Sequence, residues 1–368
     1  MQGRNIDVFI LNQKCNDVQY QALEPAYTSI AKPPAFLFGS VPGALNQWLF
    51  GRFNIGSMGV YRVAGGALSC DGLPFYNGTA LLSPQWNTSD KVAETAVGKS
   101  DITDWSRPTR FIEGDVVSIT GPGVSVWGHW LVDFLPRLYV LHLAGYNIQN
   151  MRFLLPDRAP GYAVHLLELI GIPASSLLRY DSATELVGCS NLILPSYMRS
   201  GNRFKFNFAA AMEFLLENII QRNQLPPSPV QSDRVLVSRG TVRAQRTLTN
   251  RFDIERLVTD RGFAAIDPTA FSILEQIAIF RSAKQVVGEY GSGLHNCMFS
   301  PAGTTICALR GSSRHPAFIQ SGIAEALDQD LGYVFGESPL EAFDQNYSIS
   351  EEDLGLALDW MDIRMRRP

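Results

Sequence analysis

The sequence predicts an α/β protein made of two domains, with a β-rich region at the N-terminus. Short β-branched runs alternate with helical patterns from residue 127 onward, and a proline-rich stretch divides this alternating part in two. The length is sufficient for two cores, because 46% of the 368 residues are apolar. These three observations fix the class before any motif is considered.

The β-rich N-terminal region spans residues 1–105. Its short apolar runs are interrupted by glycine and proline, and the turn dipeptides Gly65-Gly66 and Asp71-Gly72 are typical of β-hairpins. We expect a small set of strands that packs on the first domain and carries little chemistry of its own.

The first α/β domain spans residues 106–223. From Trp127, apolar side chains recur every three or four residues until Gly145, which predicts a helix. The same patterns predict strands at 153–155, 177–180 and 192–194, and helices at 162–170 and 206–222. This alternation predicts a mostly parallel sheet covered on both faces.

A proline-rich linker at 224–230 leads to the second domain, residues 231–368. Strands are predicted at 235–238, 263–266, 286–287 and 304–309, and helices at 253–261, 269–282 and 350–366. Such a series is Rossmann-like, and ligands in these sheets bind beyond the carboxyl ends of the strands. Two α/β domains joined by a linker therefore predict a ligand-binding cleft.

Composition and charge exclude several classes of function. A net charge of −4 argues against general nucleic-acid binding. No segment resembles a signal peptide and no apolar run is long enough to span a bilayer, so we expect a cytoplasmic protein. The cysteines lack metal-ligand spacing and are expected to be reduced, buried thiols: Cys15, Cys70, Cys189, Cys297 and Cys307.

A glycine-rich turn follows the predicted strand at 286–287. Gly288, Gly291 and Gly293 precede a helical pattern that begins at Leu294. A strand, a tight turn and a helix N-terminus leave backbone N–H groups free to bind an anion. The spacing differs from the dinucleotide fingerprint, and the turn occurs late in the α/β series.

An arginine cluster follows the predicted strand at 235–238. Arg239, Arg243, Arg246 and Arg251 lie in a thirteen-residue window that contains no carboxylate. Arginine pairs with phosphate oxygens in a bidentate manner, so the cluster is interpreted as a diphosphate clamp. A solvated basic loop remains the alternative.

A histidine and an aspartate occur at helical spacing in the first domain. His129 and Asp133 are four residues apart, so a helix places them on one face. A carboxylate beside an imidazole fixes its tautomer and makes it a better base, which suits deprotonation of a hydroxyl nucleophile. A purely structural pair is the alternative.

Several motifs, in this order along the chain, resemble glycosyltransferase family 61. They are Gly128–Arg137, Val235–Arg239, Ile266–Pro268, Leu274–Ile277, Ala283–Asn296 and Ser300–Gly303. The family includes EGF-domain and dystroglycan N-acetylglucosaminyltransferases, plant xylan glycosyltransferases and bacterial members near polysaccharide gene clusters. The similarity extends from about residue 58 to residue 309. It is specific for the family and does not indicate the sugar.

The resemblance implies a GT-B architecture, with two Rossmann-like domains facing across a cleft and a sugar nucleotide, usually UDP-linked, bound by the C-terminal one. It also implies inverting transfer without a metal ion or other cofactor. Arg239 and Arg246 would hold the diphosphate, and Glu275 would bind the ribose. The full set expected at the donor is Arg239, Arg243, Arg246, Glu275, Glu289, Tyr290, Gly291, Ser292, Gly293, Leu294, His295 and Asn296.

On the acceptor side, the resemblance implies His129 and Asp133 as the catalytic pair, with Trp130 and Arg137 beside them. The sequence departs from the family at one position. Members commonly have Gly-x-His-Gly-Ala-Gly, whereas Tyr290 occupies the histidine position here. Tyr290 would then act by hydrogen bonding without positive charge, or a later histidine, His295, would substitute.

The implied function is an inverting glycosyltransferase of bacterial polysaccharide biosynthesis that acts on a glycan or lipid-linked saccharide, which leaves room for peripheral contact with the inner membrane. A non-catalytic sugar-nucleotide- or glycan-binding protein of the same fold is the alternative. An NAD-dependent oxidoreductase is disfavoured because Gly-x-Gly-x-x-Gly is absent from the first strand of either half. Asp328 and Asp330 spell a metal-binding Asp-x-Asp, but they follow the last predicted strand and are interpreted as a solvated face.

Overall fold

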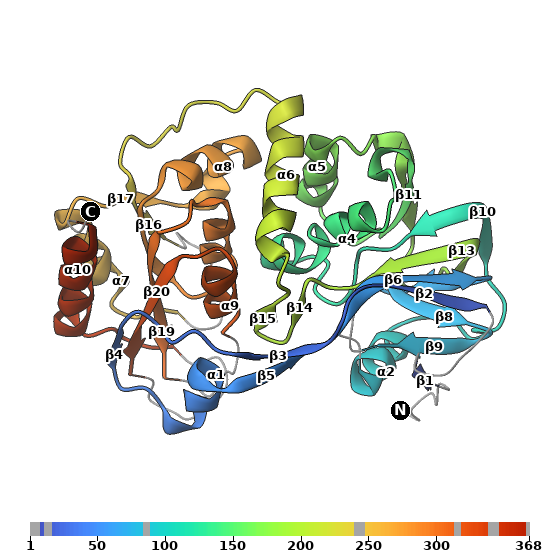
Figure 1. The fold of residues 1–368 in the computed structure, drawn as a ribbon, viewed down its shortest axis with the longest axis horizontal. Helices are drawn as coiled ribbons and strands as arrows, with labels where there is room; N and C mark the ends of the chain where they lie inside the picture. The colour runs from blue at the N-terminus through green and yellow to red at the C-terminus, as the bar shows by residue number, and fades with distance from the viewer. Residues whose placement is uncertain are drawn as a thin grey trace. The chain divides into compact units, whose positions relative to one another are not determined.

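The computed structural model forms two compact units, each with its own sheet and helices (Figure 1). The first unit comprises Met1–Tyr27, Asn54–Gly201 and Ala210–Asn223, and the second comprises Thr28–Phe53, Asn202–Ala209 and Gln224–Pro368. The structure describes residues 8–10, 17–83, 89–238, 247–312, 318–337 and 346–365. The predicted α/β class is confirmed.

Four parallel strands form one side of the sheet in the first unit. They are adjacent in the order β13-β10-β11-β12, and every pair among neighbours is parallel. Their bounds are β10 (Arg110–Val117), β11 (Arg152–Pro156), β12 (Leu177–Tyr180) and β13 (Val187–Pro195). The strands expected near 153–155, 177–180 and 192–194 are therefore present, and the sequence analysis missed β10.

The other side of this sheet comes from the N-terminal region and is mainly antiparallel. Its strands are β1 (Val8–Ile10), β2 (Val18–Glu24), β6 (Met58–Ala64), β7 (Ala67–Ser69), β8 (Leu73–Tyr76) and β9 (Thr79–Leu82). Asp71-Gly72 connects the antiparallel strands β7 and β8, so the hairpin predicted there is confirmed. Among the described strands, β1 pairs in parallel with β9.

The hairpin predicted at Gly65-Gly66 is wrong. Strands β6 and β7 lie end to end, and both pair with β13. The Gly65 N–H donates to the Ser190 carbonyl, and the Gly66 carbonyl accepts from the Cys189 N–H. The two glycines therefore interrupt a continuous run of pairing along one side of β13. This arrangement is favoured because β13 is long enough to pair with both β6 and β7.

Helices cover this sheet in the first unit (Figure 1). The buried side chains of Ala93 and Val97 pack α2 onto the hairpin strands β7–β9, and α4 packs on β6 and β13. The main helices are α2 (Asp90–Gly98), α4 (Arg137–Leu143), α5 (Gly161–Ile170) and α6 (Phe208–Arg222).

The second unit contains a six-stranded parallel sheet in the order β17-β16-β18-β19-β20-β4. Its strands are β4 (Leu37–Gly39), β16 (Arg234–Val237), β17 (Ala264–Ile266), β18 (Gln285–Glu289), β19 (Thr305–Gly311) and β20 (Asp330–Gly336). Figure 1 shows α7 and α10 on one face and α8 and α9 on the other. Their bounds are α7 (Arg251–Asp260), α8 (Ile273–Ser282), α9 (Ile319–Ala326) and α10 (Glu351–Met365).

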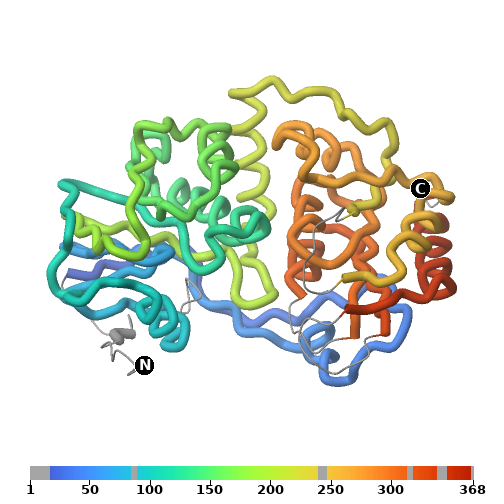
Figure 2. The backbone as a smooth tube through the Cα atoms, turned by 180° about the vertical axis from the view of Figure 1, so that it is seen from behind, coloured from blue at the N-terminus to red at the C-terminus, as the bar shows by residue number. Residues whose placement is uncertain are grey.

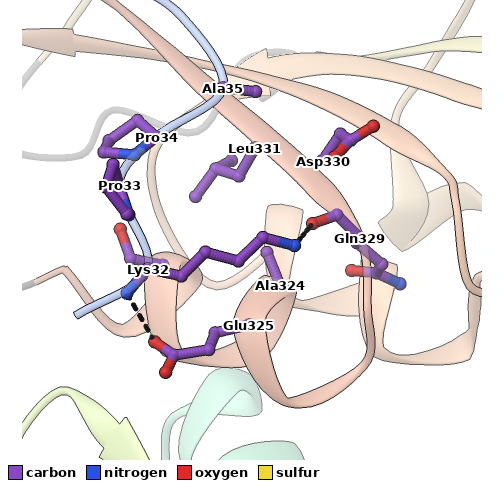
Figure 3. Close-up of a pocket in the computed structure, with 10 residues that line it drawn as sticks. Lys32, Pro33, Pro34, Ala35, Ala324, Glu325, Gln329, Asp330 and Leu331 are labelled. Atoms are coloured by element: carbon purple, nitrogen blue, oxygen red, sulfur yellow. Dashed lines mark hydrogen bonds between the residues drawn. The ribbon is translucent and has the colours of Figure 1, made fainter. Parts of the chain in front are cut away.

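The sixth strand, β4, comes from the N-terminal part of the chain. Its backbone pairs in parallel with β20, and Figure 2 shows this segment, in blue, beside the red strands of the second unit. The Ala35 N–H donates to the Leu331 carbonyl at 2.7 Å, and the Lys32 ammonium to the Gln329 carbonyl at 3.5 Å (Figure 3). Residues 28–53 thus group with the second unit, which differs from the boundary expected at residue 105.

The remaining short elements complete the path of the chain. Strands β3 and β5 pair with each other, and so do β14 and β15. Their bounds are β3 (Tyr27–Ile30), β5 (Arg52–Ile55), β14 (Arg199–Ser200), β15 (Arg203–Phe204) and, with them, helix α1 (Asn46–Phe50).

Two expectations about residue environment can be compared with the described part of the chain. Four cysteines there are buried and free, as predicted: Cys70, Cys189, Cys297 and Cys307. Burial raises the pKa of the Cys70 thiol to about 11 and that of Cys189 to about 12, so these thiols are unreactive at neutral pH. None of the described helices is long and apolar enough to cross a bilayer.

The docking of β4 can be tested at Gly332, where an added Cβ would overlap the buried ring of Phe36. Gly332→Ala should destabilise the second unit by about 1–3 kcal/mol through overpacking, measured by amide hydrogen exchange in β4 and β20. Phe36→Leu in the same chain should recover part of the loss. Gly355→Ala is the control, because no atom lies within 4 Å of its added Cβ. Unchanged exchange in Gly332→Ala would show that β4 is not packed as described.

Candidate active site

A π-helical turn carries the predicted catalytic pair. The helix expected from Trp127 to Gly145 is interrupted: α3 (Trp127–His129) passes into a π-helical segment, η3 (Trp130–Phe134), before α4 begins. The Leu135 N–H donates to the Trp130 carbonyl five residues earlier, at 3.0 Å. Single π-helical turns occur frequently at functional sites. This turn widens the backbone where His129 and Asp133 lie.

His129 and Asp133 are hydrogen-bonded, as their spacing predicts. His129 Nδ1 lies 2.6 Å from Asp133 Oδ2. The carboxylate is 1% exposed and also accepts two hydrogen bonds from Arg199, from Nε to Oδ1 at 2.5 Å and from an Nη to Oδ2 at 2.9 Å. Sequence analysis missed Arg199, which belongs to the two-residue strand β14 and carries no local signal.

The charge of Asp133 sets the tautomer of His129. Burial alone would raise the pKa of Asp133, but the Arg199 charge and the hydrogen bonds from His129 and Arg199 outweigh it and lower the pKa below its usual value. The aspartate is therefore a carboxylate at neutral pH and accepts a hydrogen bond from His129 Nδ1–H. Nε2 then carries the lone pair, and no described residue hydrogen-bonds it. The histidine side chain is 34% exposed, so Nε2 can accept a proton from a ligand.

A glycine loop packs against this imidazole. Gly123 has φ +86°, and an added Cβ there would lie 2.5 Å from His129 Cδ2 and 2.8 Å from Nε2. Only glycine fits this position, because the conformation is left-handed and the ring is in contact.

Trp130 and Arg137 donate hydrogen bonds to backbone carbonyls of the same loop. The Trp130 indole N–H donates to the Val124 carbonyl at 2.7 Å, and Arg137 donates to the Thr120 carbonyl at 3.2 Å and to the Pro195 carbonyl at 2.7 Å. Burial lowers the pKa of Arg137 to about 10, which still leaves it charged at neutral pH. Both side chains are at most 2% exposed. They lie beside the His129–Asp133 pair, and their burial indicates that they position the loop.

The glycine-rich turn has the predicted strand–turn–helix form. Strand β18 leads through residues 290–293 into η7 (Leu294–Phe299), a short 3₁₀-helix. The N–H groups of residues 294–296 donate to the carbonyls of residues 291–293. The preceding three N–H groups, of Gly291, Ser292 and Gly293, have no hydrogen-bond partner among the described residues. They are available to an anion individually, since so short a helix adds little dipole.

The strand that precedes the arginine cluster in the sequence ends beside this turn. Strand β16 ends at Val237, which pairs with Gly288, and an added Cβ on Gly293 would lie 3.3 Å from a Val237 methyl. The predicted diphosphate ligands Arg239, Arg243 and Arg246 follow directly in the sequence and lie outside the described residues.

Arg251 and Glu289 pair with each other. An Nη of Arg251 lies 3.0 Å from Glu289 Oε1, and the carboxylate is only 5% exposed. The Tyr347 hydroxyl lies 3.5 Å from the other oxygen. This partly buried pair supports a structural role for both residues at the edge of the donor turn.

Tyr290 lies over a buried arginine. The Arg310 guanidinium is 5.2 Å from the Tyr290 ring centroid, 4.2 Å from that of Phe318 and 5.5 Å from that of Phe335. The Tyr290 hydroxyl accepts from the Ile319 N–H at 3.2 Å. A cation therefore lies beneath the residue that replaces the family's histidine. Sequence analysis missed Arg310, because only the parallel pairing of β18 and β19 brings it beside the turn.

His295 and Asn296 are buried beneath the turn. His295 Nδ1 lies 3.0 Å from Gln320 Oε1, and the Asn296 amide donates to Gln276 Oε1 at 3.1 Å. Their exposures are 6% and 0%. These contacts attach η7 to α9 and α8, so both residues support the turn, and Asn296 has no surface to offer a ligand.

Glu275 forms a capping box with Ser272 at the start of α8. The carboxylate accepts from the Ser272 N–H at 2.8 Å, and the Glu275 N–H donates to the Ser272 hydroxyl at 3.3 Å. These hydrogen bonds lower the pKa of Glu275. Helix capping accounts for this residue without a ribose contact.

Asp328 and Asp330 lie at the amino ends of the parallel strands, whereas the glycine turn follows the carboxyl end of β18. Contrary to the sequence analysis, Asp330 begins a sheet strand, β20, and it pairs with Arg364 at 2.9 Å. Asp328 is exposed and lies 3.7 Å from Lys32. No group of three or more metal-ligating side chains occurs within the described residues.

The model of glycosyltransferase family 61 matches residues 127–307. The chain belongs to this family. The matched part of this family 61 glycosyltransferase starts at α3, just before the π-helical turn, and ends in β19, so it includes the His129–Asp133 pair, the arginine cluster and the glycine turn. No curated protein matches the chain at a significant level.

The coupling of Asp133 to Arg199 can be measured by a double-mutant cycle. Arg199→Met should lower the free energy of unfolding by about 3–5 kcal/mol, because it removes the cation beside a buried carboxylate. Adding Asp133→Asn should recover part of this loss in urea denaturation. Arg62→Gln, which removes an exposed partner of Asp115, should cost less than about 1 kcal/mol. Additive losses at the two sites would contradict the coupling.

Proposed function

We propose that this family 61 member is an inverting glycosyltransferase of the GT-B type, which transfers a sugar from a UDP-linked donor to a hydroxyl of a glycan or lipid-linked saccharide. The observation that supports it most is the geometry of His129, whose Nδ1 is fixed by a buried carboxylate while Nε2 has no hydrogen-bond partner among the described residues. We place the enzyme in the cytoplasm, in bacterial polysaccharide biosynthesis.

His129 Nε2 is the proposed general base. It takes the proton of the acceptor hydroxyl as the oxygen attacks the anomeric carbon of the donor. The bond between that carbon and the diphosphate oxygen breaks from the opposite side, so the configuration inverts. The imidazolium that forms is stabilised by Asp133, whose negative charge is itself held by Arg199.

The second unit is proposed to stabilise the departing UDP. The N–H groups of Gly291, Ser292 and Gly293 supply donors, and Arg239 and Arg246 supply charge. Arg310 contributes a positive field through the Tyr290 ring, in the place where the family has a histidine. We propose a metal-independent reaction, because Asp328 and Asp330 are at the amino edge of the sheet and already pair with Lys32 and Arg364.

Nucleotide selectivity tests the donor assignment. In thermal unfolding with EDTA present, UDP at a hundredfold excess over its Kd should stabilise the protein by about 2.7 kcal/mol, and GDP, CMP and NAD should have little effect. Magnesium should not change the UDP effect. A shift only with magnesium would contradict metal independence, and no shift with any nucleotide would favour a glycan-binding protein that has lost its donor.

Two substitutions separate the base from the donor site. His129→Ala should lower turnover by about 10²–10⁴-fold with unchanged UDP affinity, because only proton transfer is lost. His165→Ala, which removes another helical His–carboxylate pair in the same unit, is the control. Equal loss of turnover and UDP affinity in His129→Ala would make His129 structural.

Arg246→Ala should instead weaken UDP binding in calorimetry, with Arg256→Ala on exposed α7 as its control.

A further inference from the structure

A cavity of about 490 Å³ lies in the first unit at the carboxyl ends of its parallel strands. Its wall includes Gly123 after β10, Arg158 after β11 and Ser182 after β12. These three strands are adjacent and parallel, and ligands of α/β sheets bind at this edge. The volume is in the range of small-molecule sites.

The cavity adjoins the proposed base. Gly123, which lines it, is the residue whose added Cβ would lie 2.8 Å from His129 Nε2. His129 is not itself a lining residue, but its imidazole contacts Gly123, which forms part of the wall. A saccharide that is bound in the cavity and extends past Gly123 would bring a hydroxyl to the base.

The cavity is basic, although the chain as a whole is acidic. Helix α2 contributes Lys91, and Lys99 follows at its C-terminus, with Thr95 between them at spacings of four on the same face. The third cation, Arg158, lies 3.4 Å from Asp71, which also lines the cavity. No described carboxylate forms an ion pair with either lysine. One acid therefore opposes three cations.

We propose that this cavity is the acceptor site and that the acceptor saccharide carries an anionic group, a carboxylate or a phosphate, bound by Lys91, Lys99 and Arg158. This inference rests on the proposed function, since it assigns the substrate class of the same reaction. It adds what the base alone cannot specify, because His129 would accept a proton from any hydroxyl. The anionic group would orient the ring, and one hydroxyl would meet Nε2.

Matched glycosides test the charge requirement on the full-length protein. Methyl β-D-glucuronide and methyl β-D-glucoside differ in a carboxylate, and glucose 6-phosphate supplies the phosphate form. We expect at least one of the two anionic probes to bind about tenfold more tightly than the glucoside in NMR titration. The probe with the larger effect identifies the anion. Equal affinity for all three, or preference for the glucoside, would overturn the proposal.

Charge-removing variants locate the binding. Lys91→Gln with Lys99→Gln should lower affinity for the anionic probe about tenfold and leave the glucoside unchanged. Arg62→Gln is the control, because it removes an exposed cation of the same unit that does not line the cavity. An equal effect of the control and the double variant would overturn the assignment to this cavity.

The NMR resonances of the histidines and the stabilisation by UDP distinguish a failure of this inference from a failure of the proposed function. The anionic probe should shift the imidazole resonance of His129 and leave that of His165 unchanged. Stabilisation by UDP without binding of either anionic probe would overturn the cavity assignment and retain the transferase. Binding of an anionic probe without any effect of UDP would retain the cavity and overturn the transferase.

Discussion

The buried carboxylate of Asp133 is the constraint on which the first unit depends. A charge that is 1% exposed must be neutralised within the protein, and Arg199 does so with two hydrogen bonds across 66 residues of sequence. This pair links the π-helical turn to β14. It also fixes the orientation of His129, since the charged carboxylate accepts the hydrogen bond from Nδ1–H and leaves Nε2 as the nitrogen that can accept a proton. The geometry of the base is therefore a consequence of how the fold compensates one buried charge.

Much of the second unit could be predicted because its signals are local. The strands β16, β17 and β18 and the helices α7, α8 and α10 each show their own periodicity, and parallel pairing follows from their alternation. Partners that are distant in sequence could not be predicted. Strand β4 has three residues and no alternation, yet it pairs with β20, which would otherwise be an exposed edge. Gly65-Gly66 resembles a hairpin turn, but β6 and β7 pair with β13 and not with each other.

At the candidate site too, local contacts could be predicted and contacts between distant residues could not. The contact of His129 with Asp133 is fixed by helical spacing and could be predicted, whereas Arg199 and Arg310 reach their partners only through tertiary pairing. Glu275 shows a different limit. The Ser272-x-x-Glu275 spacing is typical of a capping box, and the structure contains one, whereas the ribose contact implied by the family resemblance stays a prediction.

The replacement of a histidine by Tyr290 has a physical interpretation in this fold. A histidine at the turn could carry its charge at the surface, where protonation depends on pH. Here a permanently charged guanidinium lies beneath a neutral ring, and the phenol oxygen is fixed by the Ile319 N–H. The aromatic cage of Tyr290, Phe318 and Phe335 stabilises Arg310 by cation–π contacts, which offset part of the cost of its burial. The positive field at the proposed donor site would then be insensitive to pH across the neutral range.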